Sequence, residues 1–110
     1  MPRRAFDALE VALGLVGAMR PVIEHLRQRD PDLTRQMKDA TNSIASNISE
    51  GGRRAGRDRL HSWRVAAGSA DEARTQLKLA VAWGDLPAPL AELPLGLLDR
   101  ELAMLWKMAH

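Results

Sequence analysis

Two groups of polar residues lie within helix-like stretches and supply the side chains that could take part in chemistry. Their polar members recur at spacings of three, four and seven: Ser43, Asn47 and Glu50 in the first group, and Ser69, Glu72 and Gln76 in the second. On a helix, each group lies on one face. Two such stripes predict either a hydrogen-bonded seam between helices or a polar binding groove.

Carboxylates on facing helices can form an acid/base pair, or a metal site when a histidine follows a glutamate by three residues. None of His25, His61 and His110 has a glutamate three residues before it. Phosphate-binding glycine loops and zinc-ligand spacings are absent as well. We therefore expect no catalytic residue, no metal and no cofactor, and predict that the protein is not an enzyme. A small-molecule or metal-binding bundle that uses the seam is a less favoured alternative.

The favoured interpretation of the seam is a network between two helices. Buried polar groups in proteins are almost always hydrogen-bonded. We expect Asn47 and Ser69 to satisfy each other or nearby backbone groups, and Glu50 and Glu72 to pair with arginines.

Basic residues are concentrated in one short stretch. Residues 1–64 hold 12 Lys/Arg and 8 Asp/Glu, whereas residues 65–110 hold 4 and 6. The densest cluster consists of five arginines: Arg53, Arg54, Arg57, Arg59 and Arg64. Such a cluster can bind phosphates or can simply be a solvated turn. Because Trp63 is the one aromatic residue near it in the sequence, we expect any nucleic-acid binding to be directed at the backbone and tolerant of sequence.

Hydrophobic periodicity predicts four helices, at residues 5–29, 31–51 and 57–83, and from about Leu90 or just after Pro94 to the end. Pro21 predicts a kink in the first helix. Asp30 is expected to cap the second helix, and Gly51-Gly52 either to end it in a left-handed conformation or to bend it. No strand-like alternation occurs. The predicted fold is all-α: one domain over residues 1–110, an up-down-up-down antiparallel four-helix bundle with a kinked first helix.

The first predicted helix carries apolar residues on two faces. One line, expected in the core, runs from Ala5 through Val16 to Leu26. The second line is the candidate oligomer interface: Val11, Leu15, Ala18 and Val22. Because a small domain has little room to bury both faces, we expect self-association in closed cyclic symmetry. Trp83 and Trp106 are expected either in the core or as anchors of that interface.

The composition narrows the class of protein. The chain has 110 residues and no cysteine, which excludes disulfides, thiolate metal sites and cysteine nucleophiles and fits a cytoplasmic protein. The N-terminal stretch contains Asp7 and Glu10 and has no clear cleavage site, so we expect no secretory signal. No apolar run approaches the length of a membrane span, and we expect no membrane partner.

The two polar groups also form a recognisable pattern. Its elements are Ser43-Ile44, Asn47-Ile48, Glu50-Gly51, Arg53 or Arg54, then Ala67-Gly68-Ser69, Glu72 and Gln76-Leu77. This pattern resembles the four-helix-bundle family that includes the proteins encoded in intervening sequences of bacterial 23S ribosomal RNA. The family is in turn similar to the accessory variability determinant of diversity-generating retroelements. That determinant is a barrel-shaped homopentamer with a basic surface that binds a reverse transcriptase and nucleic acid.

The resemblance implies a bacterial homo-oligomer, a pentamer by analogy, with RNA, DNA or a reverse transcriptase as partner. We expect a non-enzymatic scaffold that binds nucleic acid, or an enzyme acting on nucleic acid, through the arginine-rich corner between the second and third helices. The alternative is an adaptor that docks another protein and has no nucleic-acid role. The net charge of +2 is mild for a retroelement factor, so the reverse-transcriptase role is one possibility among several.

Overall fold

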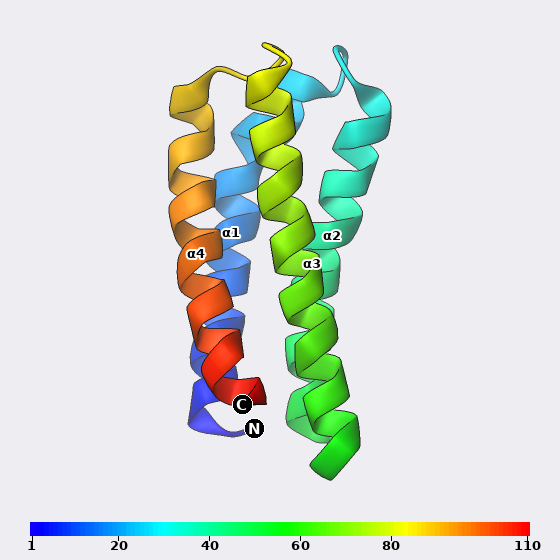
Figure 1. The fold of residues 1–110 in the computed structure, drawn as a ribbon, viewed down its shortest axis with the longest axis vertical. Helices are drawn as coiled ribbons and strands as arrows, with labels where there is room; N and C mark the ends of the chain where they lie inside the picture. Colours follow the sequence, from blue (N-terminus) through cyan, green and yellow to red (C-terminus); the bar gives the residue numbers. More distant parts are fainter.

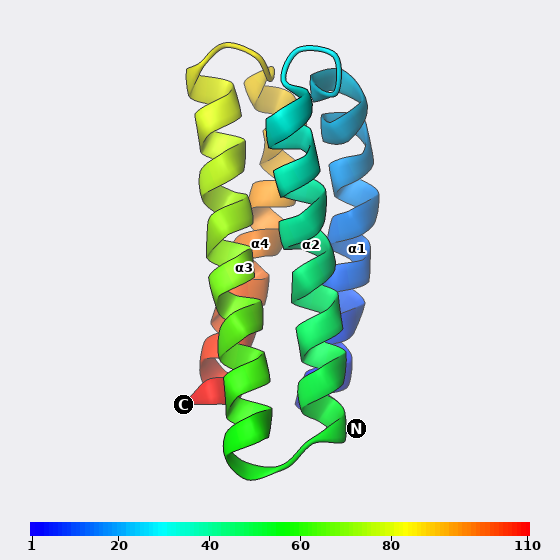
Figure 2. The ribbon, with the colours of Figure 1, turned by 90° about the vertical axis from the view of Figure 1, so that its right-hand side faces the viewer.

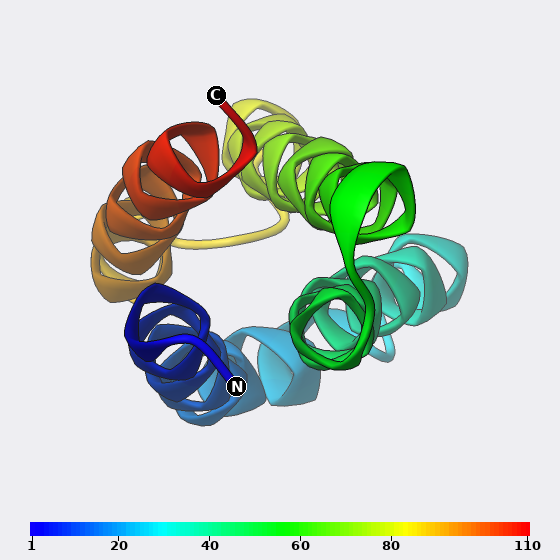
Figure 3. The same ribbon diagram turned by 90° about the horizontal axis from the view of Figure 1, so that it is seen from below.

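The computed structural model describes residues 1–110 as four long helices joined by short turns (Figure 1). The helices are α1 (Arg3–Leu26), α2 (Pro31–Arg53), α3 (Gly56–Ala82) and α4 (Ala88–Ala109). Each helix contacts its two neighbours around a ring, so that α1 lies diagonally across from α3 (Figure 3). The predicted all-α, up-down-up-down bundle is confirmed. None of the four helices combines the length and the apolar character that crossing a membrane requires.

The start of α2 follows directly from local sequence. The side chain of Asp30 accepts a hydrogen bond from the backbone N–H of Leu33 at 3.0 Å, and Pro31 occupies the first turn, where its missing N–H costs nothing. The predicted cap is therefore confirmed.

The end of α2 differs from the prediction. The helix continues through Gly51 and Gly52 to Arg53, and the left-handed residue of this turn is Gly56, with φ +58°. Gly51 lacks a side chain for another reason: a Cβ atom there would collide with the indole of Trp63. The pair of glycines thus marks a close helix approach and not a helix end.

The prolines inside helices do not divide them. α1 continues past Pro21 to Leu26 as one helix, and the kink expected at Pro21 stays a prediction. α4 begins at Ala88, before Pro94, which lies buried inside the helix. The later of the two predicted starts for this helix is therefore wrong.

The core side of α1 is wider than predicted. Leu15 and Val22 are 0% exposed and Val11 is 8% exposed. These three residues had been assigned to the oligomer interface, and Ala18, the fourth, is half-buried. Conversely, Val16 of the predicted core line is 39% exposed. Because Ala12, Met19 and Leu26 of the predicted core line are buried too, both apolar lines contribute to the surface that packs against α2 and α4.

The core between α3 and its neighbours is built from small side chains. Four alanines of α3 are completely buried: Ala66, Ala70, Ala73 and Ala80. Small residues allow helix axes to approach closely, and longer side chains such as Leu77, Ile44 and Leu98 fill the remaining space. The bundle is accordingly slender, with extents of 42 × 21 × 19 Å.

Candidate nucleic-acid interface

The polar seam joins α2 to α3 through Ser43. The hydroxyl of Ser69 lies 2.8 Å from the hydroxyl of Ser43, and the amide of Asn47 donates to the same hydroxyl at 3.1 Å and to the backbone carbonyl of Ser43 at 2.9 Å. The interhelical network is therefore present, but Asn47 and Ser69 do not bond each other directly. Ser43 lies between them and is the residue that connects the two helices.

The remaining seam residues behave differently from one another. Glu72 accepts a hydrogen bond from the amide of Gln76 at 3.3 Å and forms no ion pair with an arginine, which corrects the prediction for this residue. Gln76 is buried, and its carbonyl oxygen has no partner. Gly68 faces open space. Glu72, Gln76 and Gly68 thus form no hydrogen bond or ion pair with the arginine corner.

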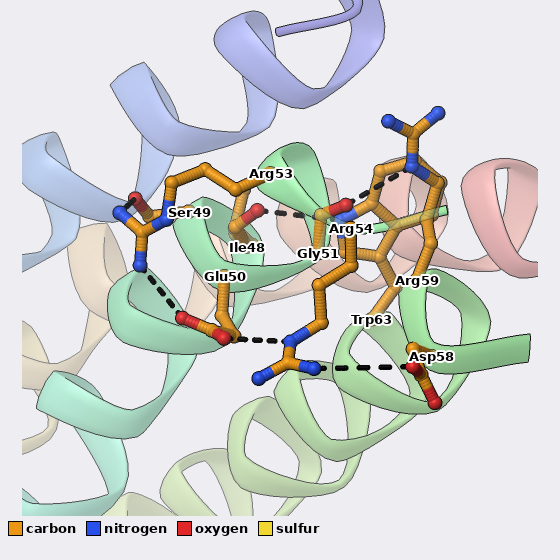
Figure 4. Close-up of polar contacts among 9 residues, drawn as sticks. All are labelled: Ile48, Ser49, Glu50, Gly51, Arg53, Arg54, Asp58, Arg59 and Trp63. Carbon is orange, nitrogen blue, oxygen red and sulfur yellow. Dashed lines mark hydrogen bonds and ion pairs between the residues drawn. The ribbon is translucent and has the colours of Figure 1, made fainter. Parts of the chain in front are cut away.

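The turn between α2 and α3 is fastened by two residues of α3 (Figure 4). The indole of Trp63 donates to the backbone carbonyl of Ile48 at 3.3 Å. The guanidinium of Arg59 donates to the carbonyls of Gly51 at 3.0 Å and Gly52 at 3.3 Å, and lies 5.3 Å from the centre of the Trp63 ring. Because the last carbonyls of a helix lack intrahelical partners, Arg59 stabilises the end of α2. Arg59 therefore has a structural role.

Glu50 lies between two arginines of the predicted patch (Figure 4). Its carboxylate oxygens are each 2.6 Å from a guanidinium nitrogen, one of Arg54 and one of Arg53. The hydrogen bonds from Arg54 and then Arg53 lower the pKa of Glu50, and the carboxylate raises the pKa of Arg54. Arg54 also lies 3.9 Å from Asp58. The predicted pairing of Glu50 with arginine is confirmed, and it partly neutralises Arg53 and Arg54.

Two arginines of the patch, Arg57 and Arg64, are exposed and form no hydrogen bond or ion pair with another side chain. They are the members whose guanidinium groups are fully available to a ligand. The five arginines therefore fall into three kinds: one that closes a helix, two that share a carboxylate, and two that are free.

The fold brings further basic residues, distant in the sequence, to the same end of the bundle as the five arginines. Met1 packs against Gly52, which brings the N-terminus to the α2–α3 turn. Arg3 and Arg4, at the start of α1, are exposed at this end of the bundle (Figure 2). Arg3 pairs with Asp7 at 3.3 Å. We call this end, with Arg3, Arg4 and the five arginines of the patch, the basic end.

The chemistry available at the basic end is that of cations and backbone donors. Guanidinium groups bind phosphate oxygens through parallel hydrogen bonds. α3 also begins here, and its N-cap residue, Ala55, offers no side-chain cap to the first N–H groups, whose partial positive charge adds to that of the arginines. No group of three or more His, Asp or Glu side chains is placed to hold a metal ion.

Comparison with known proteins places this arrangement in a family. A family model described as 23S rRNA-intervening sequence protein matches residues 5–106. No curated protein matches the chain.

A solved structure from Bacteroides thetaiotaomicron VPI-5482 has the same fold. It is described as a protein with unknown function from the S23 ribosomal protein family. The two chains superpose with a TM-score of 0.88 at 16% sequence identity, over 96% of this chain and 97% of the other. That likeness concerns the fold, whereas the family match covers nearly the whole sequence. The chain belongs to the family of 23S rRNA-intervening sequence proteins.

Proposed function

We propose that the protein is a non-enzymatic, self-associating scaffold that binds nucleic acid through the phosphate backbone at its basic end. The observation that carries this proposal is the meeting of three segments, residues 3–4, 53–54 and 57–64, at one end of a bundle whose net charge is only +2. Phosphate contacts give affinity without reading sequence. Arg57 and Arg64 are the residues we assign to direct phosphate contact.

Self-association is the second part of the proposal, and its surface differs from the line Val11, Leu15, Ala18 and Val22. Large apolar side chains are exposed on two diagonal helices: Phe6 and Leu13 on α1, at 51% and 55%, and Leu79 and Trp83 on α3, at 47% and 78%. Two different patches on opposite sides of one subunit suit a head-to-tail contact, which closes into a ring when the rotation allows. Several basic ends in one ring would raise the local positive potential.

The nucleic-acid part is tested by reversing the charge of the two free arginines. Arg57→Glu combined with Arg64→Glu should weaken retention of generic RNA at least tenfold at low salt and make the remaining binding less salt-dependent, because fewer counterions are released. Fluorescence anisotropy across a salt series measures both quantities.

The matched control reverses the same number of charges at the other end. Arg27 and Arg29 are exposed near the end of α1 and form no ion pair. Arg27→Glu with Arg29→Glu should leave RNA affinity within about twofold, since any remaining effect is long-range and screened. Equal losses of RNA affinity in both double variants would show that only the net charge of the protein matters. The absence of RNA binding by the unaltered protein would favour the adaptor function, in which a protein is the partner.

A further inference from the structure

The C-terminal end of α4 carries an aromatic pair that no function has yet used. The rings of Trp106 and His110 stack with their centres 4.8 Å apart and their planes 13° from parallel. The backbone carbonyl of Trp106 lies 3.0 Å from the Nδ1 atom of His110, which holds the imidazole over the indole. Trp106 nevertheless remains 62% exposed. A solvent-facing stack of two flat rings is therefore present on the surface.

The fold places this pair at the same end of the bundle as the free arginines. Arg74 of α3 contacts Asp99 of α4 at 3.1 Å, which fixes the register of the antiparallel pair. Arg64 lies ten residues before Arg74, and Trp106 lies seven after Asp99. At about 1.5 Å per residue, Arg64 is displaced from Arg74 by about 15 Å along the helix axis, and Trp106 is displaced from Asp99 by about 10 Å. Because α3 and α4 are antiparallel, both displacements run towards the same end of the bundle. Figure 2 shows the C-terminus at the end that holds the N-terminus and the α2–α3 turn.

The surroundings distinguish Trp106 from the other tryptophans. Lys107 is exposed next to it and, like Arg64, forms no ion pair. Trp63 is buried and engaged with Arg59. Trp83 lies at the C-terminal end of α3, which is the end farthest from the basic end. Trp106 therefore combines an exposed ring with unpaired cations at the basic end, and this combination recurs where proteins bind single-stranded nucleic acid.

We propose that Trp106 and His110 form a stacking platform for an unpaired base of single-stranded RNA or DNA whose phosphates contact Arg64 and Lys107. This inference rests on the proposed function and adds a preference to it. A base inside a duplex has its faces covered by its neighbours, so the platform is available to single strands alone. The protein should accordingly bind single strands more tightly than duplexes of equal phosphate number.

The first test compares oligo(U) and oligo(dT) of about ten nucleotides, a usual site size, with a duplex of equal length. Trp106→Leu should weaken single-strand binding about tenfold, the usual effect of one lost stacking contact, and leave duplex binding within about twofold. Trp106→Phe should restore much of the affinity. Leu93→Ala is the matched control, an exposed apolar side chain near the other end of α4, and should change neither affinity.

The second test reads the contact directly. In a Trp83→Phe variant, Trp106 is the one exposed tryptophan, so oligo(U) should quench the exposed indole fluorescence whereas heparin, a polyanion without bases, should not. An unchanged single-strand affinity in Trp106→Leu, with duplex binding intact, would overturn the platform and leave the proposed function standing. A change of native mass in Trp106→Leu would instead make Trp106 a protein contact and overturn the platform. No binding of any oligonucleotide by the unaltered protein would overturn both.

Discussion

The most unusual single residue is Glu101, a carboxylic acid in the middle of the core. Its side chain is 0% exposed, neither of its oxygens has a hydrogen-bond partner, and it lies between Leu98 and Leu105 on the buried face of α4. Burial raises the pKa of Glu101 to about 8, against a smaller opposing effect of the neighbouring Arg100. The group is therefore protonated in the folded protein at neutral pH.

This raised pKa predicts how stability changes with pH. In the unfolded chain the carboxyl ionises near its ordinary pKa of 4.5, whereas the folded protein keeps the proton until about pH 8. The contribution of Glu101 to the free energy of unfolding is therefore fully present below pH 4.5 and is lost as the pH rises to about 8. Over this whole window the free energy of unfolding falls by on the order of 5 kcal/mol. Glu101→Gln should remove this dependence and give the variant the higher melting temperature at pH 8.5.

Thermal melts from pH 5 to pH 9 measure the effect. Glu92→Gln provides the control, because Glu92 is an exposed carboxylate of the same helix and should leave the pH profile unchanged. Parallel pH profiles for the unaltered protein and Glu101→Gln would show that the carboxyl reaches solvent in the folded state.

At the scale of the helices, the junction of α2 with α3 depends on a single missing side chain. The indole of Trp63 occupies the space where a Cβ atom of Gly51 would be, and from there it donates to the carbonyl of Ile48. Arg59 closes the same helix end. The position of the arginines at the basic end is thus set by a packed contact together with the hydrogen bonds of Arg59.

Two glycine-to-alanine substitutions test this junction. Gly51→Ala should destabilise the protein by about 2 kcal/mol or more, because the methyl group displaces Trp63 from a packed site. Gly68→Ala should instead stabilise it by about 0.5–1 kcal/mol, since Gly68 lies within α3 with open space around it and alanine is the better helix former. Urea denaturation gives both values, and an unchanged midpoint for Gly51→Ala would show that the indole can move aside without cost.

The sequence predicted these helices well because their signals are local. Amphipathic spacing, the Asp30 cap and Pro31 act within one or two turns, and each was found where it was predicted. The role of Gly51 depends on Trp63, twelve residues away on another helix, and the sequence offered only the more common explanation of a helix end. Similarly, the sequence predicted Arg59 only as a member of the arginine cluster, because its carbonyl partners become neighbours only after the turn has formed.

For the whole molecule, the decisive feature is the pair of apolar patches on diagonal helices. In the head-to-tail contact that we propose, the α1 patch of one copy, around Leu13, would meet the α3 patch of the next, around Trp83. A two-fold symmetric contact would use one patch twice. The two arrangements give different outcomes when variants are mixed.

Leu13→Arg and Trp83→Glu should each prevent assembly when studied alone, because each removes one half of every contact. An equimolar mixture should form dimers, since the intact α3 patch of the first variant meets the intact α1 patch of the second. Native mass spectrometry resolves the species. Survival of the full assembly in either single variant would exclude the head-to-tail contact through these patches.

The sequence by itself determined the four helices, their order and the polar residues that link α2 to α3, because these follow from periodicity and short-range chemistry. The burial of both apolar lines of α1 within one subunit was decided only by tertiary packing, since the sequence does not show how much of a helix its neighbours cover. The same holds for the basic end: Arg3, Arg64 and Trp106 are far apart along the chain, and three antiparallel reversals bring them to one end of the bundle.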